Sequence, residues 1–323
     1  MNKPQHIQAS RSSHPMRRHS RGFTLVELMV AVALGLFVIT VVIQGFAAST
    51  AASNTNSVVA ESSTNGRHAL EVLKREVRHA ALHRLVWDAS QIVNDDATLA
   101  TKDYGCGAGF VTDLRFGIIG FNDNNPYAAS CLATASDRAY ARGDVLVLRR
   151  TSRVPAGSFD IGAPYVRTAY GVANVFIGAT TTDVPLLPEP NFDYRMVSDV
   201  YFVNAFTNSA NETPKVPALY RLTLTPGANP QMKPELVASN VEQFQVQYAV
   251  ADGGGNIRYY DANAITATDW PLVKTARIWL LTRESTSEAG FVSGEYVLGD
   301  VTYRPADNFR RTVYSSTIAI RNN

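Results

Sequence analysis

Hydrophobic positions follow three different patterns along the chain. Residues 23–47 are almost continuously apolar, and Glu27 is the one charged residue among them. From residue 59 to residue 80, apolar or small residues recur at alternating spacings of four and three, the period of one helix face. From about residue 104 onward, short runs alternate apolar and polar residues with the period of two that half-buried strands show. These patterns predict one long helix over about 24–84, followed by a β-rich region.

The strand patterns predict a single globular domain over residues 86–323. Residues 220–224 and 244–250 alternate in polarity, while 145–148 and 278–281 are continuous apolar runs typical of central strands. Further strands are expected at 112–119, 199–205 and 311–320. Loops rich in Gly, Pro, Asn and Asp are expected at 121–130, 181–196, 207–217, 225–234 and 251–256. The predicted fold class is therefore α+β, with a long N-terminal helix packed on an antiparallel β-rich domain.

Length and charge divide the N-terminal part into three segments. Residues 1–22 carry five of the 30 Lys and Arg residues and no acid, which leaves 25 basic against 28 acidic residues elsewhere. A helix over 23–47 would be roughly 37 Å long, enough to cross a hydrocarbon core of about 30 Å. The positive-inside rule places 1–22 in the cytoplasm, 23–47 in the membrane, and the amphipathic helix half, 48–85, on the far side.

A carboxylate inside a membrane-length segment is costly, so Glu27 requires a partner or a task. A secretory signal cleaved near "GFAASTAAS" (45–53) explains the basic start, but the apolar run exceeds an ordinary signal core of about 7–15 residues. An uncleaved anchor with Glu27 reaching the interface is physically sound, yet it leaves "RGFTLVE" (21–27) unexplained.

The segment "RGFTLVE" resembles the class III leader site of type IV pilins and type II secretion pseudopilins. That site has a basic leader, a glycine (here Gly22), a phenylalanine (Phe23), and a glutamate as fifth residue of the mature chain (Glu27). The resemblance implies that a membrane prepilin peptidase cuts between Gly22 and Phe23 and N-methylates Phe23. It also implies that Glu27 of one subunit neutralises the new amine of another subunit in a helical assembly.

The C-terminal part carries a second resemblance, to the PilW family of minor pilins over about residues 199–323. The segments that carry it, in order, are "VYFVNAF", "ALYRLTL", "ELVASNVEQFQVQYAV", "VKTARIWLLTRES" and "RRTVYSSTIAIRN". The resemblance implies a minor type IV pilin that helps initiate pilus assembly and sits in a tip priming complex, supporting twitching motility and adhesion. Its expected partners are other minor pilins, the major pilin, the prepilin peptidase and a tip adhesin. The expected location is the inner membrane, with the C-terminal domain in the periplasm, and then the pilus tip.

The alternative is a J-type minor pseudopilin of a type II secretion system. Such proteins share the leader and the helix, but their chains tend to be shorter than this one.

The chain has two cysteines, Cys106 and Cys131, both in the part predicted to be exported. In an oxidising compartment they are expected to form a disulfide, which would stabilise the fold by roughly 3–4 kcal/mol. The alternative is a pair of independent buried thiols.

Candidate chemistry elsewhere is sparse, and neither catalysis nor a cofactor nor a metal is predicted. His79 and His83 are four residues apart, but no third ligand accompanies them, so exposed helix histidines are the simpler interpretation. "NDNN" (122–125) and "ADGGGN" (251–256) resemble fragments of calcium loops, yet ordinary turn chemistry accounts for both.

Nucleic acid is not an expected partner. Two groups of arginines, 149, 150 and 153 or 310 and 311, are alternative candidates for a basic stripe, but strand-end arginines usually pair with nearby acids. These candidates are Arg149, Arg150, Arg153, Arg310 and Arg311.

Overall fold

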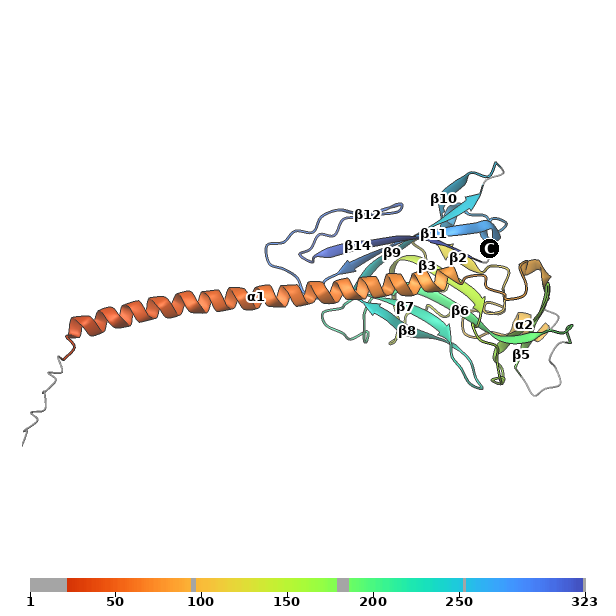
Figure 1. Cartoon of the computed structure of the whole chain (residues 1–323), viewed down its shortest axis with the longest axis horizontal. Coiled ribbons are helices and arrows are strands. Elements are labelled where there is room, and N and C mark those ends of the chain that lie inside the picture. The colour runs from red at the N-terminus through yellow and green to blue at the C-terminus, as the bar shows by residue number, and fades with distance from the viewer. Residues whose placement is uncertain (1–21, 94–96, 179–185, 252–253, 322–323) are drawn as a thin grey trace, which may run out of the picture. The chain divides into compact units, whose positions relative to one another are not determined.

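The computed structural model describes residues 22–93, 97–178, 186–251 and 254–321 (Figure 1). The chain divides into two compact units, Met1–Thr55 and Asn56–Asn323. Apart from Gly22, the predicted leader lies outside the described residues. In its described part, the first unit is essentially the beginning of helix α1, and the second contains the rest of α1 and the β-rich domain.

Helix α1 runs from Leu25 to Arg78 without interruption and confirms the predicted long helix. It contains a segment that is long and apolar enough to cross a membrane, and no side chain of that segment is buried within the described part of the protein. From residue 62 onward one face of the helix is buried against the rest of the second unit.

The helix ends six residues before the predicted boundary at 84. Ala81 and Arg84 have positive φ angles of 57° and 63°, which are incompatible with a continuing α-helix. The Ala81 N–H donates to the carbonyl of Arg149 at 3.0 Å instead, so the chain leaves α1 to bond with a strand. Gly117 permits this approach, since a Cβ there would lie 2.5 Å from the Ala81 Cα.

In its described residues, the second unit contains four strands of 11 to 13 residues, several shorter strands and a few very short helices. The strands are β1 (Ile92–Val93), β2 (Ile118–Phe121), β3 (Tyr140–Thr151), β4 (Pro164–Ala169), β5 (Val172–Ile177), β6 (Phe192–Asn204), β7 (Ala218–Leu224), β8 (Met232–Ser239), β9 (Val241–Ala251), β10 (Ile257–Asp261), β11 (Val273–Arg283), β12 (Tyr296–Leu298), β13 (Val301–Tyr303) and β14 (Arg311–Ala319). The short helices are α2 (Ala97–Thr101) and the 3-10 turns η1 (Ala89–Gln91), η2 (Ala262–Ala264) and η3 (Trp270–Leu272).

These strands form three sheets. The largest has the order β1-β5-β4-β6-β3-β2, with β7 also paired to β6 and β8 paired to β7. The second has the order β10-β9-β11-β14, and β12 and β13 form a separate hairpin. All pairs are antiparallel except the two-residue β1–β5 contact, so the predicted α+β class with antiparallel sheets is confirmed.

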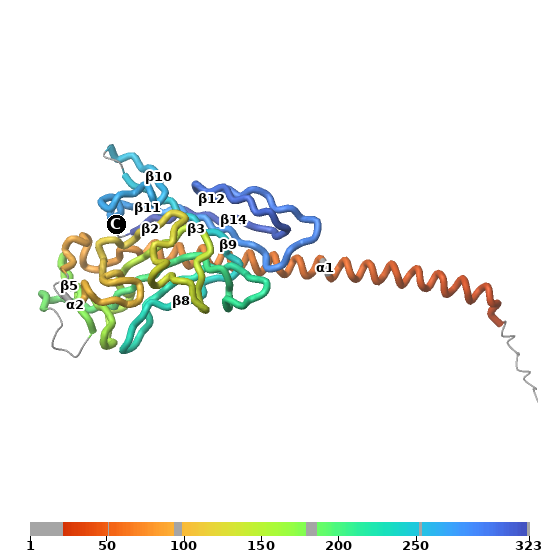
Figure 2. Tube along the Cα trace, turned by 180° about the vertical axis from the view of Figure 1, so that it is seen from behind, coloured from red at the N-terminus to blue at the C-terminus, as the bar shows by residue number. Residues whose placement is uncertain are grey.

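The main core lies between α1 and the two larger sheets. Its helix members Leu70, Leu73 and Val77 cluster with Leu146 of β3 and Phe244 of β9. Strand β14 runs alongside the second half of α1 in both backbone views (Figures 1 and 2). A second cluster covers the opposite side of β3 and β6, which explains why 145–148 is apolar at every position.

Most predicted strands are confirmed, but the strand at 112–119 is largely wrong. Only 118 and 119 belong to β2, and 112–117 form turns. The Arg149 side chain donates to the carbonyls of Phe110 (2.9 Å) and Phe116 (3.2 Å), which removes this backbone from strand pairing.

Two predicted loops are shorter than expected. Strand β6 begins at Phe192 and β8 at Met232, inside the loops predicted at 181–196 and 225–234. Residues 181–185 of the first loop lie outside the described part.

Strand β9 is buried on both faces rather than on one. Gln243 and Gln245, predicted to face solvent, are 4% and 1% exposed. Gly143 of β3 approaches Gln243 closely, and the Gln245 amide donates to Asp123 at 2.8 Å, so the start of β3 and the turn after β2 cover this face.

Candidate functional site

The start of α1 is a capping box built from Thr24 and Glu27. The Glu27 carboxylate accepts the Thr24 N–H at 3.0 Å and the Thr24 hydroxyl at 3.1 Å, and the Glu27 N–H donates to the Thr24 hydroxyl oxygen at 3.2 Å. This is the reciprocal arrangement that satisfies N-terminal amides of a helix. Glu27 thus has a local task within its own chain. The spacing T-x-x-E signals that task in the sequence, although the sequence reasoning overlooked it.

The helix that follows presents apolar surface on all sides. Phe23 is 85% exposed and Leu25 75% exposed, and every described side chain from residue 22 to residue 57 is exposed. Gly35 has no neighbouring atoms within 4 Å that a Cβ would meet. A helix that is apolar all round is stable only in lipid or among other helices, so this segment is built for a membrane or a helical assembly.

The second half of α1 fits closely against the sheet formed by β9, β11 and β14. A Cβ at Gly66 would lie 2.4 Å from the ring of Tyr314, so only glycine permits the observed distance. Ala69, Leu73 and Val77 are fully buried in the same seam. The face predicted from spacing is therefore the buried one, except that Val59 at its start is exposed.

Glu76 also lies in this seam, although it is a charged residue. It is 4% exposed, and its carboxylate binds Arg150 at 2.6 Å, Arg75 at 2.9 Å and Arg153 at 3.7 Å. Burial favours a higher pKa for Glu76, but the arginines together outweigh it and hold the pKa below its usual value. The ion cluster ties α1 to β3. No local sequence signal identifies it, because Arg150 is 74 residues away.

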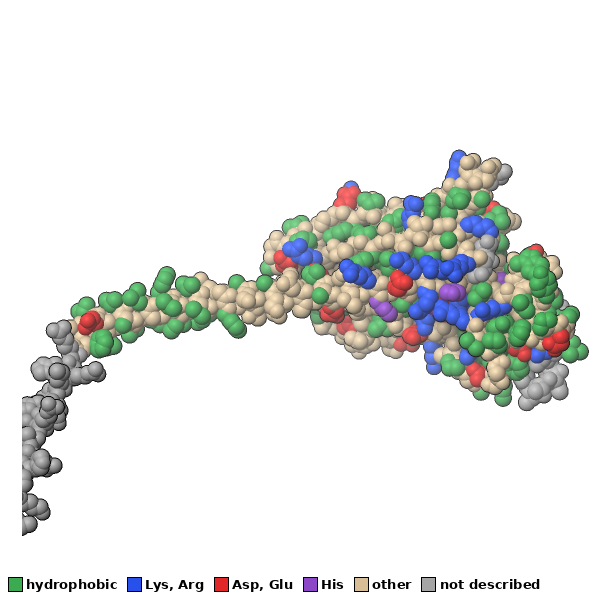
Figure 3. Space-filling view, in the orientation of Figure 1, with side chains coloured by type: hydrophobic (Ala, Val, Ile, Leu, Met, Phe, Trp, Pro, Cys, Tyr) green, Lys and Arg blue, Asp and Glu red, His purple; other side chains and the backbone are tan. Residues whose placement is uncertain are grey.

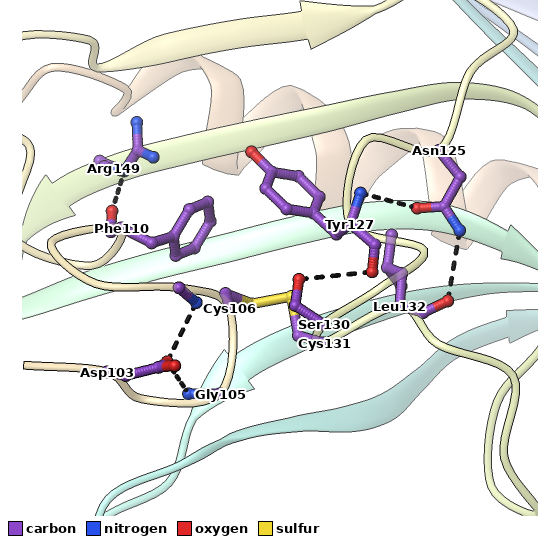
Figure 4. The surroundings of a disulfide bond; sticks show 11 residues. Asp103, Gly105, Cys106, Phe110, Asn125, Tyr127, Ser130, Cys131, Leu132 and Arg149 are labelled. Carbon is purple, nitrogen blue, oxygen red and sulfur yellow. Dashed lines mark hydrogen bonds between the residues drawn. A yellow bond between two sulfur atoms is a disulfide. The ribbon is translucent and has the colours of Figure 1, made fainter.

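Cys106 and Cys131 form the predicted disulfide (Figure 4). Both cysteines are buried in the second cluster, where Phe110 meets Tyr127 edge to face at 5.2 Å. The loop around Cys106 is also held by side-chain bonds, because the Gly105 N–H donates to the Asp103 carboxylate (Figure 4) and the Gly107 N–H donates to the same carboxylate. The bridge therefore fixes a layer of loops over β3 and β6.

Four of the five arginines considered for nucleic acid pair with carboxylates. Arg150 and Arg153 bind Glu76, and Arg310 and Arg311 bind Glu288 and Glu242, as expected for strand-end arginines. Arg149 differs, because it is 4% exposed, lies over the Phe110 ring at 4.6 Å, and bonds to backbone carbonyls. Arg311 is the most enclosed of the paired arginines, since its side chain is 0% exposed.

The two histidines do not form a metal site. His83 lies beyond the end of α1 and is 4% exposed, which corrects its interpretation as an exposed helix histidine. Neither of its ring nitrogens has a hydrogen-bond partner, and burial lowers its pKa to about 4. His79 is half-buried, with Nδ1 2.6 Å from the Arg75 carbonyl oxygen. Across residues 22–321, gaps excepted, no group of three or more His, Cys, Asp or Glu side chains is placed to hold a metal ion.

The two loop fragments that resemble calcium sites have different outcomes. "NDNN" forms a turn in which Asn125 accepts the Tyr127 N–H at 3.1 Å, in agreement with turn chemistry. The second fragment includes residues 252 and 253, which lie outside the described part.

Comparison with known families matches both ends of the chain. The prokaryotic N-terminal methylation motif matches residues 17–43, and the family Type IV Pilus-assembly protein W (PilW) matches residues 200–322. No curated protein sequence matches the chain significantly. Among solved structures, a type IV-like pilin from Thermus thermophilus is similar at 14% identity and a TM-score of 0.33, over 79% of this chain and 92% of that one, which is a weak likeness. The C-terminal part of the chain is therefore similar to the PilW family of type IV pilin-like proteins, and its N-terminal part carries the methylation motif at the start of an apolar helix that is long enough to anchor a protein in a membrane.

Proposed function

We propose that this protein is a minor pilin that helps initiate assembly of a type IV pilus and occupies a priming complex at the pilus tip. In that position it supports twitching motility and adhesion. The observation that carries the proposal is the motif Gly22-Phe23 with Glu27, placed directly at the start of an apolar helix segment, none of whose side chains is buried within the described part of the chain.

Maturation is the first step of the proposed function. A prepilin peptidase cuts between Gly22 and Phe23 and methylates the new amine of Phe23. Gly22 precedes the first turn of α1 and is exposed, so an extended backbone can enter a protease at this point. The chain stays in the inner membrane through α1, with the β-rich domain in the periplasm, until it enters the filament.

Assembly is the second step. The amine of Phe23 is positively charged and Glu27 is negatively charged, and both are poorly solvated once helices bundle around them. The Glu27 carboxylate of one subunit neutralises the amine of its neighbour, exchanging some of the Thr24 hydrogen bonds for an ion pair. Apolar helices of the other minor pilins and the major pilin then surround residues 25–46.

The large second unit suits a cap better than a shaft. Residues 56–323 form a domain with three sheets and long covering loops, and such a bulk crowds the lateral packing that a shaft subunit requires. A position at the tip, beneath an adhesin, avoids that crowding. The role is structural, and catalysis forms no part of it.

Mass spectrometry of the membrane-extracted mature chain tests the proposal. The chain is expected to begin at Phe23 and to carry one additional methyl group. A chain that begins at Met1 or beyond residue 47 would overturn the proposal. Deletion of the gene then tests the pathway: loss of surface pili and twitching is expected, whereas loss of protein secretion with intact pili would assign the chain to a secretion system.

A further inference from the structure

Positive charge gathers on one face of the second unit. Lys and Arg side chains cluster over the region where the second half of α1 crosses the domain (Figure 3). We call this the basic face and define it by Arg67, Lys74, Arg75, Arg78, Lys274 and Arg321. The chain after residue 22 has three more acidic than basic residues, 28 against 25, so this concentration of cations is a local segregation of charge.

The basic face is continuous across three elements. On α1, residues 67, 71, 74, 75 and 78 share one stripe by helical spacing, opposite the buried seam. The Arg321 N–H donates to the Arg78 carbonyl at 3.4 Å, and the Ile320 N–H donates to the Lys274 carbonyl at 2.9 Å. The end of the described chain and the start of β11 therefore extend the helix stripe sideways.

Most of this charge is uncompensated within the chain. Arg67, Arg78, Lys274 and Arg321 are exposed, and within the described part they make no ion pair with a carboxylate. Lys74 contacts Glu71 only at 3.8 Å. Arg75 shares Glu76 with Arg150 and Arg153, so a single carboxylate serves three arginines.

We propose that the basic face binds an acidic helix face of a different pilin-like subunit. The inference rests on the proposed function, because it assigns a partner to the helix that enters the assembly. Contact between the basic faces of two copies of this chain would set cations against cations, and like charges across an interface suppress pairing. The basic face therefore selects heterotypic over homotypic neighbours along this stripe of the helix.

The shape and charge pattern favour a protein partner over nucleic acid. The stripe on α1 is straight and has helical period, so a second helix can lie along it. Glu71 stands in the middle of the stripe with its side chain 77% exposed, where it would repel a phosphate backbone. An acidic helix bearing one or two cations accommodates the same Glu71 by pairing with it.

Site-specific crosslinking in the producing bacterium tests this inference on the full chain. One strain carries a photo-crosslinking residue in place of His68, an exposed neighbour of Arg67, and a second carries it in place of Val38 in the apolar segment. The expected product at position 68 is a covalent adduct with another pilin-like chain, whose crosslinked peptide carries an excess of Asp and Glu.

Charge reversal supplies the decisive comparison. Arg67→Glu, Arg78→Glu and Lys274→Glu together break no ion pair of the described chain, and they should lower the adduct at position 68 by on the order of tenfold or more. The matched control Arg67→Lys, Arg78→Lys and Lys274→Arg should retain it within about twofold. When Asp and Glu residues of the crosslinked partner peptide are replaced by Lys, the triple Glu variant should again form the adduct.

Three results would overturn the inference: an adduct to a second copy of this chain alone, a nuclease-sensitive adduct, or a yield that charge reversal leaves unchanged. The Val38 strain separates these from failure of the proposed function. If position 38 still crosslinks to pilins, only the basic-face inference fails. If position 38 crosslinks to no pilin, the assembly role itself is wrong.

Discussion

Glu27 has two possible tasks, and two substitutions separate them. In the single chain its carboxylate completes the capping box with Thr24. In an assembly we propose that it neutralises the amine of a neighbouring Phe23. Glu27→Gln keeps a side-chain oxygen for the Thr24 N–H, because glutamine also serves in a capping box, but it removes the charge. Thr24→Ala removes the hydroxyl bonds of 3.1 and 3.2 Å and keeps the charge.

The two tasks differ in magnitude. Loss of an N-cap side chain costs about 1 kcal/mol, which corresponds to roughly a fivefold change in an equilibrium. Removing one partner of a buried ion pair costs about 3–5 kcal/mol, because the remaining charge is left in a poorly solvating environment. We therefore expect Glu27→Gln to lower incorporation into the pilin complex by at least about 100-fold, and Thr24→Ala to lower it by about fivefold at most.

The assay compares both variants at equal expression in cells that carry the partner subunits. Incorporation is measured by quantitative immunoblotting of sheared pili and of the crosslinked membrane complex, and leader cleavage is checked by the mass of the mature chain. Glu27→Gln that assembles as well as wild type would refute charge neutralisation. Equal defects in Thr24→Ala and Glu27→Gln would show that helix capping is the dominant role of Glu27.

Three further predictions concern the β-rich domain, and each is measured by urea unfolding of the full chain in detergent with tryptophan fluorescence. Replacing Cys106 and Cys131 by alanine should reduce the free energy of unfolding by about 3.5 kcal/mol, since the closed loop spans 25 residues; a loss below about 1 kcal/mol would contradict the loop-entropy estimate. Arg311→Met should cost about 3 kcal/mol because it leaves the buried carboxylate of Glu242 with only the more distant Arg283, at 3.7 Å, and full stability would show that the Arg311–Glu242 ion pair contributes nothing net. His83 is held neutral by burial, with a pKa of about 4 in the folded chain against 6.5 when unfolded, so the unfolded state binds the proton first as pH falls. Stability should decline by roughly 3 kcal/mol between pH 6.5 and 4 on this account, and His83→Leu should remove that part of the decline; an unchanged pH profile would exclude His83 as its cause.

The sequence predicted the features that depend on local pattern. The apolar run at 23–47 and the spacing of Leu70, Leu73 and Val77 were sufficient for α1 and its buried face, because helical period is a property of neighbouring residues. The disulfide was predictable for a different reason: with Cys106 and Cys131 as the only cysteines, one pairing was possible.

The errors arose where distant residues decide local structure. Helix α1 ends at Arg78 because the Ala81 N–H donates to the Arg149 carbonyl in β3. The residues near 78 carry no signal that predicts this contact with a distant strand. A charged residue such as Glu76 is expected at the surface of a helix, but β3 places Arg150 and Arg153 beside its carboxylate, and Glu76 is buried. His83 became a core residue once the chain had turned away from the helix axis. Tertiary contacts of this kind override the structure that the hydrophobic period and the helix propensity of a segment predict.

The disulfide also limits how far the molecule can be stretched. Cys106 and Cys131 are 25 positions apart in sequence but their Cα atoms are 4.6 Å apart. Fully extended, that segment would span roughly 80–90 Å. Under a pulling force strong enough to unfold the strands, the intact disulfide prevents the segment between the two cysteines from extending. An oxidised chain therefore lengthens less under tension than a reduced one, and the layer of loops over β3 and β6 remains linked as a closed ring.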